Sequence, residues 1–257
     1  MTGFLLHLQG PMMSFADKGF GQLREEGEFP SRSVALGILA AAMGLERGSE
    51  RLLELHRELQ VHVASLRRGS LLVDYHTILT SGYDNHDPAR LRREGAKGNP
   101  TLTWRSYHTD AHFMTFIESD NTNLLDEARQ ALTAPVYTSF IGRRSCPPSI
   151  PLLPVDVQSK KLDEIFIGET REWISRIKGD RQEIPYHIRR NLSDHLDVWI
   201  DKGDAINGIK PLRTSFRRDL LTALPRSYVN RPVIHGRIQL PDDLRFNTNE
   251  RYFHGAY

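Results

Sequence analysis

The sequence contains little cysteine, little net charge and no long apolar run. Its single cysteine, Cys146, excludes an internal disulfide and fits a reducing cytoplasm. No apolar stretch approaches the ~20 residues of a membrane span. Residues 1–8 lack the basic start of a signal peptide and read as a first strand. We therefore expect neither a membrane protein nor a disulfide-rich secreted domain.

The patterns of several enzyme classes are also absent. The chain has no P-loop, no GxGxxG, no GxSxG and no paired-carboxylate spacing. Nucleotide hydrolysis, dehydrogenase and esterase activity are accordingly disfavoured. A formal net charge of +2 is too small to indicate a nucleic-acid partner by itself. The local distribution of the charges has to decide that question.

Length and composition indicate a folded protein with a substantial core. At 257 residues the chain is near the upper limit for one hydrophobic core, so we expect one large domain or one domain with a smaller appendage. Hydrophobic residues make up 39% and charged residues 26%, which excludes a chain that is disordered throughout.

Hydrophobic periodicity predicts an α+β fold in the first 150 residues. The expected elements, in chain order, are a strand at 4–8, an exposed loop at 12–28, a helix capped by Ser31 or Ser33 and ending at Gly44, a helix at 51–59, a β-hairpin at 61–75 turning at Arg68-Gly69, β structure at 101–117, a helix at 123–132 capped near Asn121, and a strand at 136–141. This order matches the split βαβ arrangement of ferredoxin-like and RRM-type domains.

The chain changes character after a proline-rich connector at residues 147–154. We expect residues 155–257 to form a small β-rich C-terminal domain with an irregular tail from residue 241. Strand-like pieces lie at 197–200 and 233–240, and a helix-like piece at 164–176. The predicted division is thus an RRM-like domain at 1–150 and a second domain at 155–257.

The most informative stretch runs from Tyr137 to Pro148, where a β-prone run ends at Gly142 and is followed by Arg143 and Arg144. An arginine pair on a corner that glycine permits is a poor core element and a good anion clamp. The alternative is that an arginine pairs with a carboxylate of a neighbouring element.

Residues 80–99 lose all periodicity and are rich in turn residues and positive charge. The basic residues are Arg90, Arg92, Arg93 and Lys97. A structureless excursion of this length is usually functional or disordered, and here it predicts an arm that reaches phosphates. The alternative is a solvated loop with incidental charge.

Aromatic residues follow this arm. On a strand, Arg105 and Tyr107 share one face and Trp104 takes the other. Aromatic rings and the planar guanidinium groups of arginine stack on the bases of single-stranded nucleic acid whatever its sequence. The alternative places Trp104 and Tyr107 in the core.

Histidines raise two enzymatic possibilities. Tyr75-His76 and Tyr107-His108 could supply an acid and a base to a metal-independent ribonuclease, although adjacent strand residues point to opposite faces. His108, Asp110 and His112 could begin a metal site for a nuclease, but no second ligand cluster accompanies them. We expect neither a metal nor a cofactor.

Several motifs in order resemble one known family. They are Leu8-Gln9-Gly10-Pro11-Met12, Phe29-Pro30-Ser31-Arg32-Ser33, Asp74-Tyr75-His76-Thr77, Thr103-Trp104-Arg105-Ser106-Tyr107 and residues 137–147. Together they resemble the CRISPR-associated CasD family (the "Cas five" RAMP proteins) of type I-E Cascade, an antiviral ribonucleoprotein. The resemblance covers residues 4–154 and does not extend over residues 155–218 or the tail.

The resemblance implies an RRM-like domain with an inserted thumb hairpin at about residues 80–102. It implies a subunit that grips the 5′ handle of the CRISPR RNA (crRNA), with the backbone subunit, the large subunit and, through the complex, target DNA as further partners. Carried over by motif, the RNA surface comprises Gln9, Arg32, Tyr75, His76, Arg105, Tyr107, Arg143 and Arg144, beside the basic thumb.

Catalysis is not expected from the resemblance. A related subtype cleaves repeat RNA with Tyr, Lys and His, whereas the Gly-Arg-Arg-Ser-Cys-Pro form here resembles the branch in which a separate subunit cuts. We therefore expect a noncatalytic crRNA-binding subunit. The alternative is a metal-independent endoribonuclease that processes repeat RNA.

Overall fold

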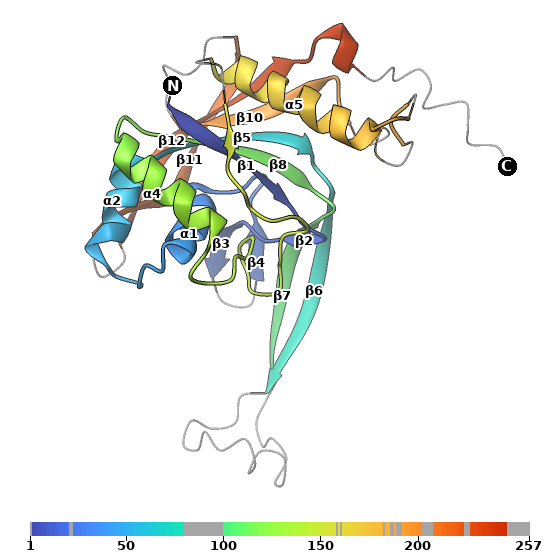
Figure 1. Cartoon of the computed structure of the whole chain (residues 1–257). Coiled ribbons are helices and arrows are strands. Elements are labelled where there is room, and N and C mark those ends of the chain that lie inside the picture. Colours follow the sequence, from blue (N-terminus) through green and yellow to red (C-terminus); the bar gives the residue numbers. More distant parts are fainter. Residues whose placement is uncertain are drawn as a thin grey trace, which may run out of the picture.

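The computed structural model describes most of the chain, and Figure 1 shows its arrangement. The described residues are 2–20, 23–79, 100–157, 159, 161–181, 183–185, 188, 192–201, 208–223 and 227–245. Arg90, Arg92, Arg93 and Lys97 lie outside them. Within the described residues, no helix combines the length and the apolar character needed to cross a membrane.

A seven-stranded antiparallel sheet forms the centre of the molecule. Its strands are β1 (Gly3–Gln9), β5 (Gln60–Arg67), β8 (His112–Glu118), β9 (Val155–Asp156), β10 (His195–Ile200), β11 (Lys210–Ala223) and β12 (Ser227–Gln239). Their order in space is β11-β12-β10-β5-β8-β1-β9. The coarse prediction of an α+β fold built on antiparallel strands is confirmed.

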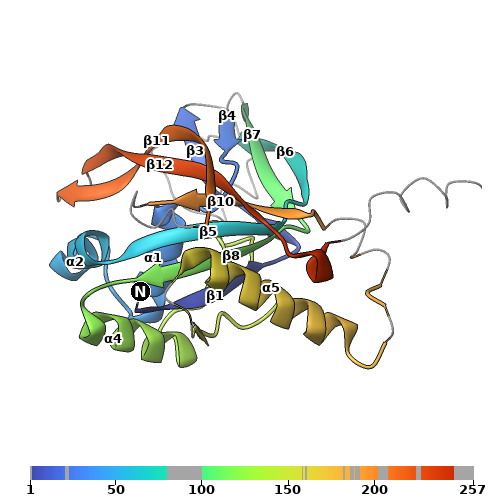
Figure 2. The same ribbon diagram turned by 90° about the horizontal axis from the view of Figure 1, so that it is seen from above.

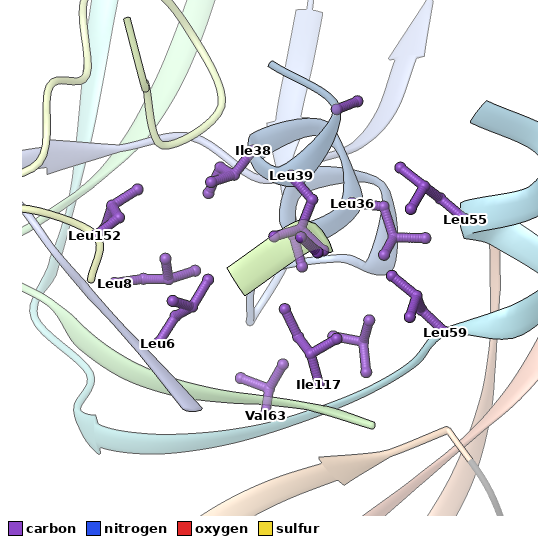
Figure 3. Close-up of a cluster of buried hydrophobic side chains, with 14 of the residues drawn as sticks. Leu6, Leu8, Leu36, Ile38, Leu39, Leu55, Leu59, Val63, Ile117 and Leu152 are labelled. Carbon is purple, nitrogen blue, oxygen red and sulfur yellow. The ribbon is translucent and has the colours of Figure 1, made fainter. Parts of the chain in front are cut away.

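Helices cover both faces of this sheet. They are α1 (Arg32–Ala42), α2 (Glu50–Glu58), α4 (Thr122–Thr133) and α5 (Leu162–Lys178), and a 3-10 turn follows at Asp242–Leu244. Figures 1 and 2 show α1, α2 and α4 on one face and α5 on the other. Strand alternation sends Leu6 and Leu8 toward α1 and Leu5 toward α5, so each face has its own apolar cluster. Figure 3 shows Leu6, Leu8 and Val63 facing Leu36 and Leu39 of α1.

Elements with a strong local signal fall where the sequence predicts them. The first strand and the helices near residues 34–43, 51–59 and 123–132 are present within a few residues of their expected bounds. The Asn121 side chain caps α4 by accepting a hydrogen bond of 3.2 Å from the Leu124 amide.

A second sheet stands beside the first and carries a projecting arm. Its strands are β2 (Met12–Met13), β3 (Ala16–Phe20), β4 (Leu23–Glu26), β6 (Ser70–Leu79) and β7 (Pro100–Thr109). The prediction of a loop over residues 12–28 is wrong, because β2 and β4 pair with β7 and β3 pairs with β4. The β6–β7 hairpin extends far from the body (Figure 1).

The predicted hairpin at residues 61–75 is also wrong, since β5 pairs with β8 and β10 whereas β6 pairs with β7. The chain does turn at Gly69, whose φ is +70°. There it passes so close to β7 that a Cβ on Gly69 would lie 2.1 Å from the Thr109 carbonyl oxygen. The turn therefore sends the chain into the second sheet instead of back along the first.

Residues 136–141 are irregular and not the predicted strand. The Val136 and Tyr137 amides donate to the Ala42 and Ala41 carbonyls, at 2.9 and 3.2 Å. They therefore bond carbonyls in the last turn of α1, where the helix itself supplies few donors. The edge position beside β1 belongs instead to β9, which pairs with Phe4 and Leu5.

The strands after residue 155 extend the larger sheet. β10 pairs with β5 at Asp197, Val198 and Trp199, and β12 follows on its other side. Trp199 joins the cluster under α1, whereas Val198 joins the one under α5. The boundary expected near residue 154 thus separates two stretches of sequence whose strands share one sheet and both apolar clusters.

A buried ionic network ties α1 to the C-terminal strands. It consists of Arg32, Arg231, Asp201 and Asp219, all with side chains less than 10% exposed. Arg32 donates to Asp201 at 2.7 Å, and Arg231 binds Asp219 through two nitrogens, at 2.6 and 3.0 Å. Burial alone would lower the Arg231 pKa, but Asp201 and Asp219 raise it above its ordinary value. The network is electrically balanced, with two cations facing two anions.

His56 beside this network predicts sensitivity to acid. Burial, followed by the Arg32 and Arg231 charges, lowers the pKa of His56 from 6.5 to about 4. Because the unfolded chain then binds the proton more readily than the folded one, stability should fall as the pH decreases from about 6.5 to about 4. The His56 contribution amounts to about 3 kcal/mol at the acid end. Urea unfolding across this range should show a shallower pH dependence for His56→Gln, and an unchanged slope would contradict the assignment.

Candidate nucleic-acid interface

The predicted arginine corner is a tight turn pinned to the body of the protein. The Ile141 amide donates to the Cys146 carbonyl at 2.8 Å, and the Ser14 amide donates to the Ile141 carbonyl at 3.1 Å. Gly142 has a φ of +94°, and a Cβ there would lie 1.8 Å from the Ser14 carbonyl oxygen. Only glycine fits at position 142. The close packing on Ser14 fixes the backbone of the turn from which Arg143 and Arg144 project.

Arg143 is half-buried against the arm. Its guanidinium lies 4.6 Å from the centre of the Tyr107 ring, and it donates to the Ser106 carbonyl at 3.3 Å. It also approaches Glu26 of β4 at 3.4 Å. The alternative of an arginine paired with a neighbouring carboxylate is therefore realised at Arg143. Arg144 is exposed, and no ion pair links it to the described part of the chain.

Glu26 approaches Arg143 from the buried side of the corner. Its side chain is 2% exposed, and burial raises the pKa of Glu26, partly offset by hydrogen bonds from Ser14 and the Phe15 amide and by the Arg143 charge. The Ser14 hydroxyl donates to it at 2.7 Å. The carboxylate thus orients Arg143 from the inner side, while the rest of the guanidinium stays half-buried at the surface of the corner.

The arm has two chemically different faces. In the β6–β7 ladder Tyr75 pairs with Trp104 and His76 with Thr103. Alternation therefore puts His76, Arg105 and Tyr107 on one face and Tyr75 with Trp104 on the other. The Tyr75 and Trp104 rings lie 5.4 Å apart and are 54% and 36% exposed. The expected surface thus divides between the two sides of the hairpin.

The face that carries Arg105 continues the arginine corner. Tyr107, at the base of this face, packs under Arg143 and is buried. Arg105 follows two residues further out, and its buried Nε has no hydrogen-bond partner among the described residues. His76 forms a hydrogen bond to Asp74. Arg143, Arg105 and His76 therefore follow one another from the corner along the arm, with the Asp74 carboxylate, opposite Arg105 in the ladder, on the same face.

Arg32 does not belong to this surface. It is 6% exposed, and its guanidinium binds Asp201 and the carbonyls of His56 and Leu59. The prediction that Arg32 belongs to the RNA surface is contradicted by its burial and by these bonds, which engage both terminal nitrogens of its guanidinium. Gln9 lies at the end of β1 beside the corner, where its carbonyl accepts from the Ser149 amide at 2.8 Å.

The histidines proposed for metal binding or catalysis are engaged separately. His108 bonds the Gly27 carbonyl at 2.7 Å, whereas buried His112 bonds His7 at 2.8 Å. Burial, then the His7 charge, lowers the His112 pKa well below its ordinary value. Among the described residues, no group of three His, Cys, Asp or Glu side chains is suited to hold a metal ion.

A cavity of about 760 Å³ opens beside the corner, between α1 and residues 137–143. Sequence reasoning missed it, as it missed Glu26, which stands in the stretch read as a loop. A cavity wall assembled from α1 and a segment a hundred residues later leaves no local pattern. The one hint in the sequence was that Ser31 and Tyr137 belong to two of the motifs shared with the family.

The comparisons with known proteins agree with this architecture. The CRISPR-associated protein (Cas_Cas5) family profile matches residues 3–199. The chain therefore belongs to this family of CRISPR-associated proteins.

Individual relatives support the same assignment. The CRISPR system Cascade subunit CasD of Escherichia coli (strain K12) is 36% identical over 154 residues, which span 58% of this chain and 68% of that protein. A chain of a CRISPR RNA-guided surveillance complex superposes with a TM-score of 0.64 at 25% identity, covering 95% of this chain and 92% of its own. A crystal structure of a Cas protein, 22% identical with a TM-score of 0.60, covers 95% of this chain and 97% of its own, and shows the shared fold.

Proposed function

We propose that this protein is a noncatalytic crRNA-binding subunit of a type I-E-like Cascade complex, gripping the 5′ handle of the guide and capping the backbone. The observation that carries the proposal is the glycine-fixed corner, which sets Arg143 and Arg144 at the base of a projecting arm. The similarity to the E. coli Cascade subunit CasD supports it. A cytoplasmic location fits the single cysteine.

The strand order supports an RRM-like or ferredoxin-like assignment for the first part of the chain. The elements β1, α1, β5, β8, α4 and β9 follow one another along the sequence, and the four strands neighbour as β5-β8-β1-β9. This is the split βαβ order with α2 added after the first helix. The β6–β7 arm, inserted between the second and third of these strands, would be the thumb, and the strands after residue 155 the appended C-terminal part.

The proposed grip is electrostatic and directional. Arg143, Arg144 and Arg105 would contact successive phosphates, because guanidinium groups form strong paired hydrogen bonds with phosphate oxygens. The Tyr75 and Trp104 rings on the other face of the arm would stack on a base or on the backbone subunit. The crRNA, the backbone and large subunits and, through the complex, target DNA are the partners of this proposal.

Binding to a handle-bearing RNA should weaken steeply with salt. For single strands the slope of log K against log salt is about −0.7 per phosphate contact, so about four contacts predict a fiftyfold loss between about 50 and 200 mM. Fluorescence anisotropy with a labelled RNA from the repeat of the neighbouring CRISPR array measures it. Binding that is weak and independent of salt would contradict the proposal.

The endoribonuclease alternative has less support. Tyr75 and His76 project from opposite faces of the arm, and His108 is engaged with the Gly27 carbonyl. The same RNA separates the two functions. After long incubation with the purified protein without metal, an intact repeat fits the binding subunit, whereas cleavage products ending in a cyclic phosphate would establish the nuclease.

A further inference from the structure

Another cavity, of about 510 Å³, opens where β5 and β10 lie side by side in the larger sheet. Figure 2 shows these two strands together. None of the residues that line this cavity belongs to the arginine corner or to the predicted RNA surface. In the strand order, β8 lies between β5 and β1, the strand beside the corner. The cavity is therefore separate from the proposed RNA grip, and its volume falls within the range of ligand pockets, about 300–1,000 Å³.

Two arginines in the wall of this cavity share one buried carboxylate. Asp197 of β10 is 4% exposed. Arg237 donates to one of its oxygens through Nε at 3.0 Å, and Arg68 donates to the other oxygen. Burial would raise the pKa of Asp197, but the bonds from Arg68 and Arg237 hold it below its ordinary value. A single negative charge thus serves two guanidinium groups, which leaves an excess of positive charge at this wall.

Arg67 is the third arginine of the cavity, and no ion pair links it to the described part of the chain. Its side chain is half-buried, and its buried Nε has no hydrogen-bond partner among those residues. A β-bulge precedes it, because Ser65 pairs with Phe113 whereas Arg67 pairs with His112. Bulges redirect the neighbouring side chains and are common beside functional sites. Asp110 also lines the cavity, but it is exposed to solvent and leaves Arg67 unpaired.

Ser65 adds a hydroxyl group that the protein itself does not use. Its side chain is 6% exposed, and it stands opposite Asp197 in the pairing of β5 with β10. Among the described residues its Oγ has no hydrogen-bond partner, although buried hydroxyls normally have one. Ser65 Oγ and Arg67 Nε are therefore two buried donors without an acceptor in the lining of one cavity.

We propose that this cavity binds a phosphate group. Arginine side chains only donate hydrogen bonds, so the ligand has to supply the acceptor oxygens. The donors approach from three places: Ser65, Arg67, and the pair formed by Arg68 and Arg237. A tetrahedral phosphate directs its oxygens toward several sides at once, whereas the two oxygens of a carboxylate lie in one plane. The volume also leaves room for a nucleoside, so the phosphate group comes either from free inorganic phosphate or from a nucleotide.

Isothermal titration calorimetry of the purified chain at constant ionic strength tests this site with inorganic phosphate, AMP and adenosine. Wild type should bind inorganic phosphate. Arg67→Gln should bind it at least tenfold more weakly, and Ser65→Ala, which removes a single oxygen atom, about tenfold more weakly. Arg57→Gln is the matched control, because Arg57 lies exposed on α2 and carries the same charge. It should bind like wild type, and thermal unfolding should show that all three variants remain folded.

The three probes also identify the source of the phosphate group. Equal affinities for phosphate and AMP, without binding of adenosine, indicate free phosphate, whereas AMP binding at least tenfold more tightly than phosphate indicates a nucleotide. Adenosine binding as tightly as AMP would overturn the inference, as would wild type that binds neither phosphate nor AMP. Phosphate binding that Arg67→Gln and Ser65→Ala leave unchanged would also overturn it. If Arg67→Gln then fails to enter the complex, the arginines bind a carboxylate of a partner protein instead. Binding of the handle-bearing RNA is a separate measurement and does not decide this one.

Discussion

Asp219→Ala is expected to lower the free energy of unfolding by about 3–5 kcal/mol, because it leaves Arg231 buried with one of its two acid partners removed. Arg231 is 8% exposed and loses two hydrogen bonds, at 2.6 and 3.0 Å. The Arg32 amide at the start of α1 loses its acceptor as well. For a chain of this size the melting temperature should fall by roughly 10 °C.

Two further variants separate the lost charge pair from a general loss of packing. Asp243→Ala removes an exposed carboxylate that pairs with Arg171 at 3.0 Å, and it should change the unfolding free energy by less than about 1 kcal/mol. Asp219→Ala combined with Arg231→Met removes the stranded cation and should recover part of the loss. Urea unfolding provides the measurement. If Asp219→Ala alone is as stable as Asp243→Ala, the network does not hold α1 to β11.

The sequence predicts the elements that depend on their own residues. The helices with a clear hydrophobic period form where expected. The Asn121 cap of α4 could be predicted because a cap is a hydrogen bond between residues close in the sequence. The corner at Gly142 was also predictable, because glycine permits the backbone conformation of a tight turn and two arginines are poor core residues. What the corner contacts was not predictable: Glu26 lies 117 residues away.

The errors concern residues whose roles depend on distant partners. The turn at Gly69 was correctly located, but the pairing of β5 with β8 and β10 is set by the rest of the sheet. Residues 136–141 have β-prone side chains, yet the Val136 and Tyr137 amides donate to carbonyls at the end of α1. Arg32 was assigned to the RNA surface through the motif that the chain shares with its family. Its burial depends on Asp201, 169 residues away, which accepts from its guanidinium.

Arg143→Ala combined with Arg144→Ala should weaken binding to the handle-bearing RNA at least tenfold and make it less sensitive to salt. Each lost phosphate contact should reduce the salt slope by about 0.7. The two positions should differ in stability. Arg144 is exposed, so Arg144→Ala should leave the melting temperature unchanged. Arg143→Ala also removes the stacking on Tyr107 and the hydrogen bond to the Ser106 carbonyl, so some stability should be lost.

Arg143→Lys and Arg171→Ala make this prediction specific to the corner. Arg143→Lys keeps the charge but loses the planar fork, so its affinity should fall between wild type and Arg143→Ala. Arg171→Ala removes the same charge from α5, on the other face of the larger sheet, and should bind like wild type. If the double variant matches Arg171→Ala in affinity and salt slope, the RNA does not contact this corner. The grip would then have to be sought on the Tyr75 and Trp104 face of the arm, whose exposed rings do not depend on either arginine.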